Sequence, residues 1–154
     1  GSASRATFME VPLDKVGDLG RPLVGRSSAF GDMDGDGDLD VILTQTGLPP
    51  LLLRNDQATG HHWLRLKLRQ PGPDIQALGA WVEAKIGDAV IHRPVMPTRS
   101  YQSQSEAAIT LGLGESTAVD SLEIHWPDGS RQTVDPQTLG IDRTVTVEKA
   151  VESE

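Results

Sequence analysis

The chain has 154 residues, of which 37% are hydrophobic, and it carries a formal net charge of −8 and no cysteine. Its acidity disfavours nucleic-acid binding, which needs a clustered basic face, and the lack of cysteine excludes disulfides, thiolate catalysis and zinc–thiolate sites. The length allows one ordinary domain, or a small domain with an appended motif, and no apolar run reaches the roughly 20 residues of a membrane span.

At the amino end, residues 1–4 have the composition of a cloning remnant. We therefore expect the natural amino terminus to be missing, so the lack of a visible signal peptide carries no information. The first predicted element lies in residues 5–57 and is a β-hairpin with an acidic loop.

The acidic loop carries an aspartate at every second position. These aspartates are Asp32, Asp34, Asp36, Asp38 and Asp40. Five like charges this close repel one another unless a hard cation neutralises them, and Ca²⁺ takes about six to eight oxygen ligands. Gly35 and Gly37 lie between them and allow the positive φ angles that a chain wrapped around an ion needs. The spacing therefore predicts Ca²⁺ as a bound cofactor.

The spacing also predicts which atoms bind the ion. Loop positions one, three, five and nine would give side-chain oxygens, and position seven a backbone carbonyl. The side-chain ligands would be Asp32, Asp34, Asp36 and Asp40, and the backbone carbonyl would be that of Asp38. An EF-hand needs a glutamate at position twelve between two helices, but that position is Leu43 and the run that contains it is β-branched and apolar. We expect the ion between two strands; the simpler alternative is a solvated hairpin turn without an ion.

The expected ion also indicates a cellular setting. Calcium is millimolar outside the cytosol and would fill even a weak loop of this kind. We therefore expect an extracellular or periplasmic protein, and a bacterial exported protein is compatible with the lack of cysteine.

The clearest strand after the loop is predicted over residues 62–69, where polar and apolar residues alternate. Three leucines share one face and three cations the other: Leu64, Leu66 and Leu68 against Arg65, Lys67 and Arg69. This pattern is typical of a half-buried strand whose leucines point inward.

Further strands are predicted at regular intervals along the rest of the chain. They cover residues 80–86, 89–93, 107–111, 121–126, 130–134 and 143–149. Strands at this spacing, with no sustained helical period, predict an all-β fold: an antiparallel β-sandwich or partly open barrel with an N-terminal calcium-loop hairpin. The only helical turn that we expect lies over residues 135–139, with Asp135 as its cap.

Two tryptophans are candidates for a ligand platform. Trp63 and Trp81 lie on the polar faces of their strands, where an exposed indole can stack on a sugar ring or fill a pocket of a partner. The alternative is that they cover the outer face of the sheet or pack against the calcium hairpin.

Other polar residues suggest weaker candidates. A transition-metal site could use some of the four histidines, although ordinary surface imidazoles are the alternative; they are His61, His62, His92 and His125. The polar run 100–106 lacks the features of a serine nucleophile, so we expect a structural role in which Tyr101 anchors an irregular edge.

Two resemblances cover most of the chain. Residues 25–40 resemble an FG-GAP (VCBS-type) repeat, the calcium-loop hairpin of integrin-like β-propeller blades. Residues 61–150 resemble the ASPIC/UnbV domain in four motifs, at 77–82, 100–105, 111–114 and 122–129. The chain has Asp74-Ile75 and Trp81 where that family commonly has Asn-Arg and Arg, so the resemblance implies no polar role at these positions.

The resemblances imply a calcium-binding module that recognises a ligand. We expect a non-catalytic, extracytoplasmic module for adhesion or ligand recognition, with structural Ca²⁺ and an unidentified protein or glycan as its partner. The alternatives are a carbohydrate-binding module and an accessory domain of a larger secreted enzyme. A propeller needs about four or more blades and this chain holds material for one, so we expect it to be part of a larger protein.

Overall fold

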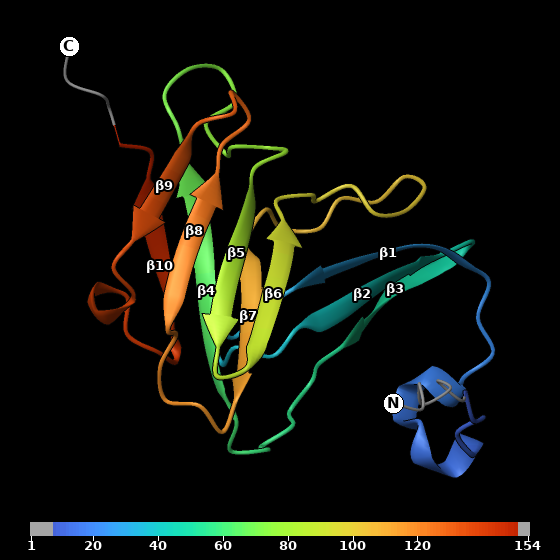
Figure 1. Ribbon diagram of the computed structural model, residues 1–154. Helices are drawn as coiled ribbons and strands as arrows, with labels where there is room; N and C mark the ends of the chain where they lie inside the picture. The colour runs from blue at the N-terminus through green and yellow to red at the C-terminus, as the bar shows by residue number, and fades with distance from the viewer. Residues whose placement is uncertain (1–7, 151–154) are drawn as a thin grey trace.

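The structure is a computed structural model that describes residues 8–150, so the expected cloning remnant lies outside the described range. The all-β expectation is confirmed: these residues form ten strands and three short 3₁₀ turns, with no α-helix in the described range. The strands build three sheets, and none of them closes into a barrel (Figure 1).

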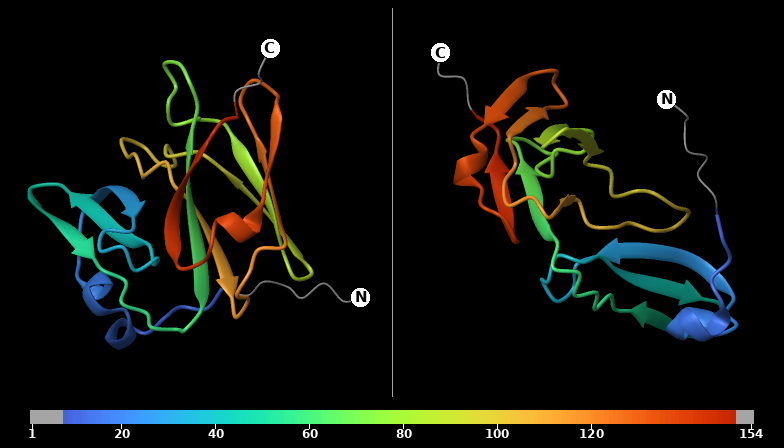
Figure 2. Two further views of the ribbon diagram at one scale, coloured as in Figure 1. Left: turned by 90° about the vertical axis from the view of Figure 1, so that its left-hand side faces the viewer. Right: turned by 60° about the horizontal axis from the view of Figure 1, so that its bottom comes forward.

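The first sheet is the predicted hairpin extended by one strand. It contains β1 (Gly25–Gly31), β2 (Asp40–Gln45) and β3 (Leu48–Leu53), paired antiparallel in that order. The acidic loop joins β1 to β2, as the sequence predicted. We call this three-stranded sheet with its loop the hairpin sheet. It projects from one side of the other two sheets (Figure 2).

Two 3₁₀ turns precede the hairpin sheet and were not predicted. They cover Leu13–Lys15 and Gly17–Gly20, and neither contains a buried residue. Because turns this short have no apolar face to bury, the hydrophobic pattern gives no signal for them.

The other two sheets form the β-sandwich. One has the order β10-β4-β7 and contains β4 (His62–Arg69), β7 (Ile109–Gly114) and β10 (Arg143–Glu148). The other has the order β6-β5-β8-β9 and contains β5 (Trp81–Ile86), β6 (Ala89–Pro94), β8 (Ser121–His125) and β9 (Arg131–Val134). Every pairing is antiparallel except that of β4 with β10, which is parallel. The expected antiparallel sandwich therefore has one parallel pair, between its first and last strands.

The hydrophobic core lies between the two sheets of the sandwich. Leu64, Leu66 and Leu68 point into it as predicted, opposite Leu122 and Ile124 of β8. Burying one such side chain is worth about 1.5–3 kcal/mol. Every buried hydrophobic residue of the described range lies at or after Leu64. The hairpin sheet thus has no apolar core of its own and depends on its contacts with the sandwich.

Two local expectations had different outcomes. Pro136–Thr138 form the predicted helical turn, and the Asp135 carboxylate accepts a hydrogen bond from the Gln137 N–H at 3.0 Å. The expectation that Tyr101 anchors its loop is wrong, because this residue is 78% exposed. Residues 105 and 106 hold the loop instead, through hydrogen bonds to β1 described below. Within residues 8–150, no helix has the length and apolar character to cross a membrane.

Candidate functional site

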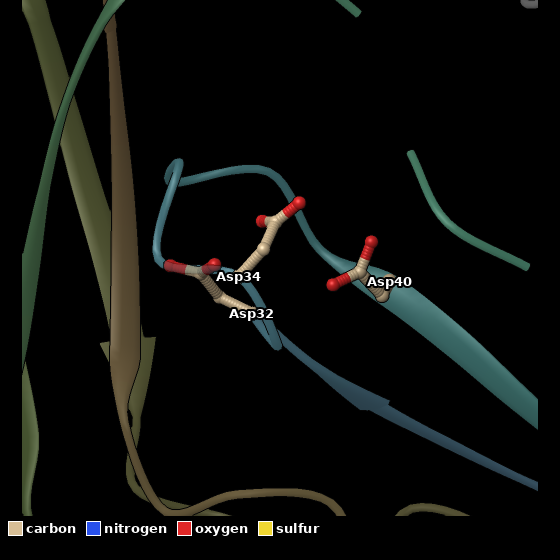
Figure 3. Close-up of side chains that lie close together, drawn as sticks. All are labelled: Asp32, Asp34 and Asp40. Atoms are coloured by element: carbon tan, nitrogen blue, oxygen red, sulfur yellow. The ribbon is translucent and has the colours of Figure 1, made fainter. Parts of the chain in front are cut away.

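The acidic loop brings three of its aspartates together. Carboxylate oxygens of Asp32, Asp34 and Asp40 all lie within 4.8 Å of one another (Figure 3). The cause is the register of the hairpin: Gly31 of β1 pairs with Asp40 of β2, so the residue after β1 and the first residue of β2 face each other across the loop. We call these three residues the aspartate triad.

The donor set of the triad fits Ca²⁺. Two oxygens that each lie about 2.4 Å from one ion can be at most about 4.8 Å apart, and the triad meets this limit. All three donors are carboxylates, which hard cations such as Ca²⁺ prefer. The triad can therefore supply three of the oxygen ligands that such an ion needs.

The other two predicted aspartates are not part of this group. The carboxylate of Asp36 accepts a hydrogen bond from the Asp38 N–H at 2.9 Å, which shapes the turn. The structure thus brings together the carboxylates at loop positions one, three and nine, while the carboxylate at position five lies outside the triad. At position seven the expected ligand is the Asp38 backbone carbonyl, and this stays a prediction.

Backbone N–H groups fix two members of the triad in place. Asp32 accepts hydrogen bonds from Gly35 at 2.7 Å and from Gly37 at 3.2 Å. Asp40 is fully buried and accepts from Asn55 at 2.9 Å and from Met33 at 2.8 Å. These two N–H donors, Asn55 first, hold the pKa of the Asp40 carboxyl below its usual range although burial opposes them. The site therefore presents an ionised, oriented carboxylate at neutral pH.

The sequence did not reveal that Arg65 belongs to this site. Its position on the polar face of β4 predicts an exposed cation, yet Arg65 is only 3% exposed. Its guanidinium binds Asp32 Oδ2 at 2.6 Å and also pairs with Glu106, while its Nε donates to Thr110 at 3.3 Å. The hairpin sheet covers this part of the polar face, which strand alternation alone cannot show. The one sequence feature that points to such a partner is the concentration of negative charge in the loop, which a nearby cation would stabilise.

The loop between β6 and β7 joins this arrangement by hydrogen bonding to β1. Phe30 N–H donates to the Ser105 hydroxyl at 3.1 Å, and Glu106 N–H donates to the Phe30 carbonyl at 3.3 Å. The Glu106 carboxylate accepts from the Asp32 N–H at 3.2 Å. Residues about 75 positions apart thus hold the hairpin sheet on the sandwich, and the loop lies along β1 (Figure 2).

Each candidate tryptophan has a neighbour within the chain. Trp63 packs on the acidic loop, where a Cβ added to Gly37 would lie 2.0 Å from the indole. Trp81 stacks on His125 of the neighbouring strand, with ring centroids 3.6 Å apart and planes at 12°, and its centroid lies 5.6 Å from that of His92. The indole of Trp63 therefore contacts the acidic loop, and both rings beside Trp81 belong to histidines.

Three of the four histidines each lie beside one acidic side chain. His62 lies 2.8 Å from Asp142, His125 lies 2.6 Å from Glu123, and His92 lies 3.7 Å from a Glu83 oxygen. The Asp142 carboxyl has its pKa lowered, chiefly by the hydrogen bond with His62. In the described part of the chain, the aspartate triad is the one cluster of at least three metal-ligating side chains.

Comparison with known proteins relates most of this chain to one family. Residues 70–154 match the family model described as ASPIC and UnbV. The chain is also 33% identical over 109 residues to cartilage acidic protein 1 of Xenopus tropicalis. That match covers 68% of this chain but only 16% of the frog protein. Strand β4 precedes the family match although it is the middle strand of its sheet, so the folded sandwich begins before residue 70.

Proposed function

Because this chain belongs to the ASPIC and UnbV family, we propose that it is a non-catalytic accessory module of a larger extracellular or periplasmic protein, and that its aspartate triad holds a structural Ca²⁺. The frog relative is much longer than this chain, which supports a role as one part of a larger protein. The name of that relative refers to cartilage, which supports an extracellular setting.

The convergence of Asp32, Asp34 and Asp40 carries the calcium proposal. When bound, Ca²⁺ supplies the positive charge that offsets the repulsion between these carboxylates. Backbone N–H groups already hold Asp32 and Asp40 in place, so these two side chains lose little conformational entropy when an ion binds. Asp34 is more exposed and is the member that can adjust to the ion. The coordination would tie the end of β1 to the start of β2.

The hairpin sheet supports the further proposal that it is an FG-GAP-type repeat used in adhesion or ligand recognition. It has the strand–acidic loop–strand order of that repeat, and none of its apolar side chains is fully buried. Leu48 and Leu52 of β3 are exposed on it. An apolar sheet of this kind gains stability when another element covers it, and we propose that the rest of the parent protein or its ligand does so.

Carbohydrate binding has less support than calcium binding. A sugar platform needs a free aromatic face, whereas Trp63 packs on Gly37 and one face of Trp81 is covered by His125.

Thermal unfolding with and without calcium tests the proposal. An ion that binds only the folded state stabilises it by about 2.7 kcal/mol at a hundredfold excess over Kd, so the Tm is higher in CaCl2 than in EDTA. Asp40→Asn removes a triad charge and abolishes most of this shift. Asp36→Asn, from the same loop but outside the triad, is the matched control and retains it. An equal Tm in CaCl2 and EDTA for the wild-type protein would contradict the proposal.

A further inference from the structure

Arg65 is the most deeply buried cation of the described chain that contacts the aspartate triad. Its side chain is 4% exposed, and that of its partner Asp32 is 1% exposed. Glu106 contributes a second carboxylate to the same guanidinium. Removing two charges from water costs several kcal/mol per ion unless they pair well. The pairing of Arg65 with Asp32 is therefore a determinant of how the hairpin sheet binds to the sandwich.

Asp32 serves two cations at once in this arrangement. One oxygen, Oδ2, is bound by the Arg65 guanidinium at 2.6 Å, and the residue is also a member of the triad that fits Ca²⁺. Both cations draw on one negative charge, so each reduces what the other gains from it. The triad has a formal charge of −3. Arg65 offsets part of this charge, and the rest of its positive charge is offset by Glu106.

We propose that Arg65 is a resident counter-ion of the calcium loop, which keeps the hairpin sheet bound to the sandwich in the absence of Ca²⁺ and weakens the affinity of the loop for the ion. This inference rests on the calcium site proposed above and adds how its affinity is set. The affinity of calcium loops is tuned by the number of ligand charges. A triad with one charge partly neutralised by an arginine belongs with weak sites that respond to extracellular calcium.

The opposite role for Arg65 is that of an orienting residue that calcium binding requires. Residues that orient metal ligands usually raise affinity, by about 10–100-fold. Asp32, however, is already oriented by the N–H groups of Gly35 and Gly37, so the loss of Arg65 leaves its position supported. No other buried cation in the described residues replaces the positive charge of Arg65 at the triad. The other nearby cation, Arg54, lies 3.8 Å from Asp34 and is 60% exposed. Solvent screens such an exposed charge.

The decisive variant is Arg65→Met, which keeps most of the apolar stem and removes the charge. We expect its Tm in EDTA to fall below that of the wild type, since Asp32 and Glu106 lose their buried partner. We expect its Kd for Ca²⁺, measured by calorimetric titration, to fall about tenfold. In the wild type, the positive charge of Arg65 lies one carboxylate away from the divalent ion and repels it. Even with the dielectric constant of water, this repulsion weakens binding by about that factor. The rise in Tm on adding CaCl2 is then larger in the variant than in the wild type.

Two controls separate the charge from its surroundings. Arg65→Lys keeps the charge but loses the forked geometry of the guanidinium. Because the charge sets the affinity, its Kd for Ca²⁺ stays within about threefold of the wild-type value. Arg54→Met removes the exposed cation near the triad and changes Kd by less than Arg65→Met does.

Glu106→Gln tests the counter-ion role of Arg65 through a change in the Kd for Ca²⁺ that is opposite to the one expected for Arg65→Met. It leaves the guanidinium to Asp32 alone, so Arg65 competes with Ca²⁺ more strongly and Kd rises several-fold. Glu106 is not part of the triad, and glutamine keeps an oxygen for the Asp32 N–H. This variant tests the counter-ion role of Arg65 even if Arg65→Met folds in neither CaCl2 nor EDTA. A Kd for Ca²⁺ that is unchanged or lower in Glu106→Gln overturns that role.

The outcomes distinguish the inference from the function on which it rests. If the wild type binds Ca²⁺ and Asp40→Asn does not, while Arg65→Met binds with equal or weaker affinity, the counter-ion role is wrong and the calcium site stands. If Arg65→Met folds only with Ca²⁺ present, the counter-ion role is supported. If neither the wild type nor Arg65→Met binds Ca²⁺, both proposals fail.

Discussion

The indole of Trp63 in β4 lies directly against Gly37 in the acidic loop: a Cβ at position 37 would lie 2.0 Å from Trp63 Cε2. Gly37 is buried and has a φ of +96°, a backbone conformation that glycine adopts without penalty. A side chain of the sandwich thus packs on the backbone of the loop that carries the aspartate triad. The absence of a side chain at residue 37 is what allows this contact.

Alanine substitution at two loop glycines tests this contact. Gly37→Ala adds a methyl group that collides with Trp63, so the indole or the loop must move. Gly35→Ala is the matched control, because Gly35 has a similar φ of +81° but open space around its Cβ position. We expect Gly35→Ala to cost about 1–2 kcal/mol of unfolding free energy from backbone strain alone, and Gly37→Ala to cost clearly more in urea denaturation. Equal costs would show that Trp63 does not pack on the loop.

The location of the core predicts where truncation is costly. Leu66→Ala opens a cavity in the centre of the sandwich, where Leu66 is fully buried, and lowers the unfolding free energy by about 2–5 kcal/mol. Leu52→Ala, on the exposed surface of the hairpin sheet, changes it by less than about 0.5 kcal/mol. Chemical denaturation of the two variants compares them, and a large effect at Leu52 would mean that the hairpin sheet has a core of its own.

The loop between β6 and β7 should be held by Ser105 and not by Tyr101. Ser105→Ala removes the acceptor of the Phe30 N–H and costs about 1 kcal/mol of unfolding free energy. Tyr101→Ala has little effect, since the ring is exposed. A Tm that falls in Tyr101→Ala but not in Ser105→Ala would reverse this assignment.

Acid should weaken the junction between the β8–β9 turn and the end of β10. The Asp128 carboxylate pairs with Lys149 and accepts two hydrogen bonds from Ser130, and these contacts, the lysine first, hold its pKa well below the usual range. A carboxyl whose pKa is lower when folded stabilises the protein above its unfolded pKa of about 3.9, and this contribution is lost as pH falls through the folded pKa. Asp128 is exposed, so the effect is modest.

The variant Asp128→Asn isolates this contribution. At pH 7 its Tm lies below that of the wild type, and the gap shrinks as the pH falls from about 4. A Tm difference that stays constant from pH 7 to pH 2 would show that ionisation of Asp128 does not contribute.

Local sequence patterns sufficed for much of the fold. The alternation of leucine and cation over residues 62–69 gives β4 and its inward face, and the aspartate spacing gives the loop between β1 and β2. These are short-range signals, since each depends on residues a few positions apart. The same holds for the Asp135 cap.

Long-range contacts were beyond these patterns. The burial of Arg65 depends on Asp32 and Glu106, which are 33 and 41 positions away, and alternation says only that Arg65 lies opposite the leucines. The parallel pairing of β10 with β4 joins the two ends of the sandwich and leaves no trace in either strand. Which aspartate side chains converge depends on the strand register at Asp40, and equal spacing cannot reveal that register.

A crystal structure of the protein grown in millimolar CaCl2, with anomalous diffraction to identify calcium, shows whether the aspartate triad holds the ion. We expect one calcium peak bounded by oxygens of Asp32, Asp34 and Asp40, at about 2.3–2.6 Å from each. A loop with no calcium peak, or calcium bound only at other acidic residues, would contradict it.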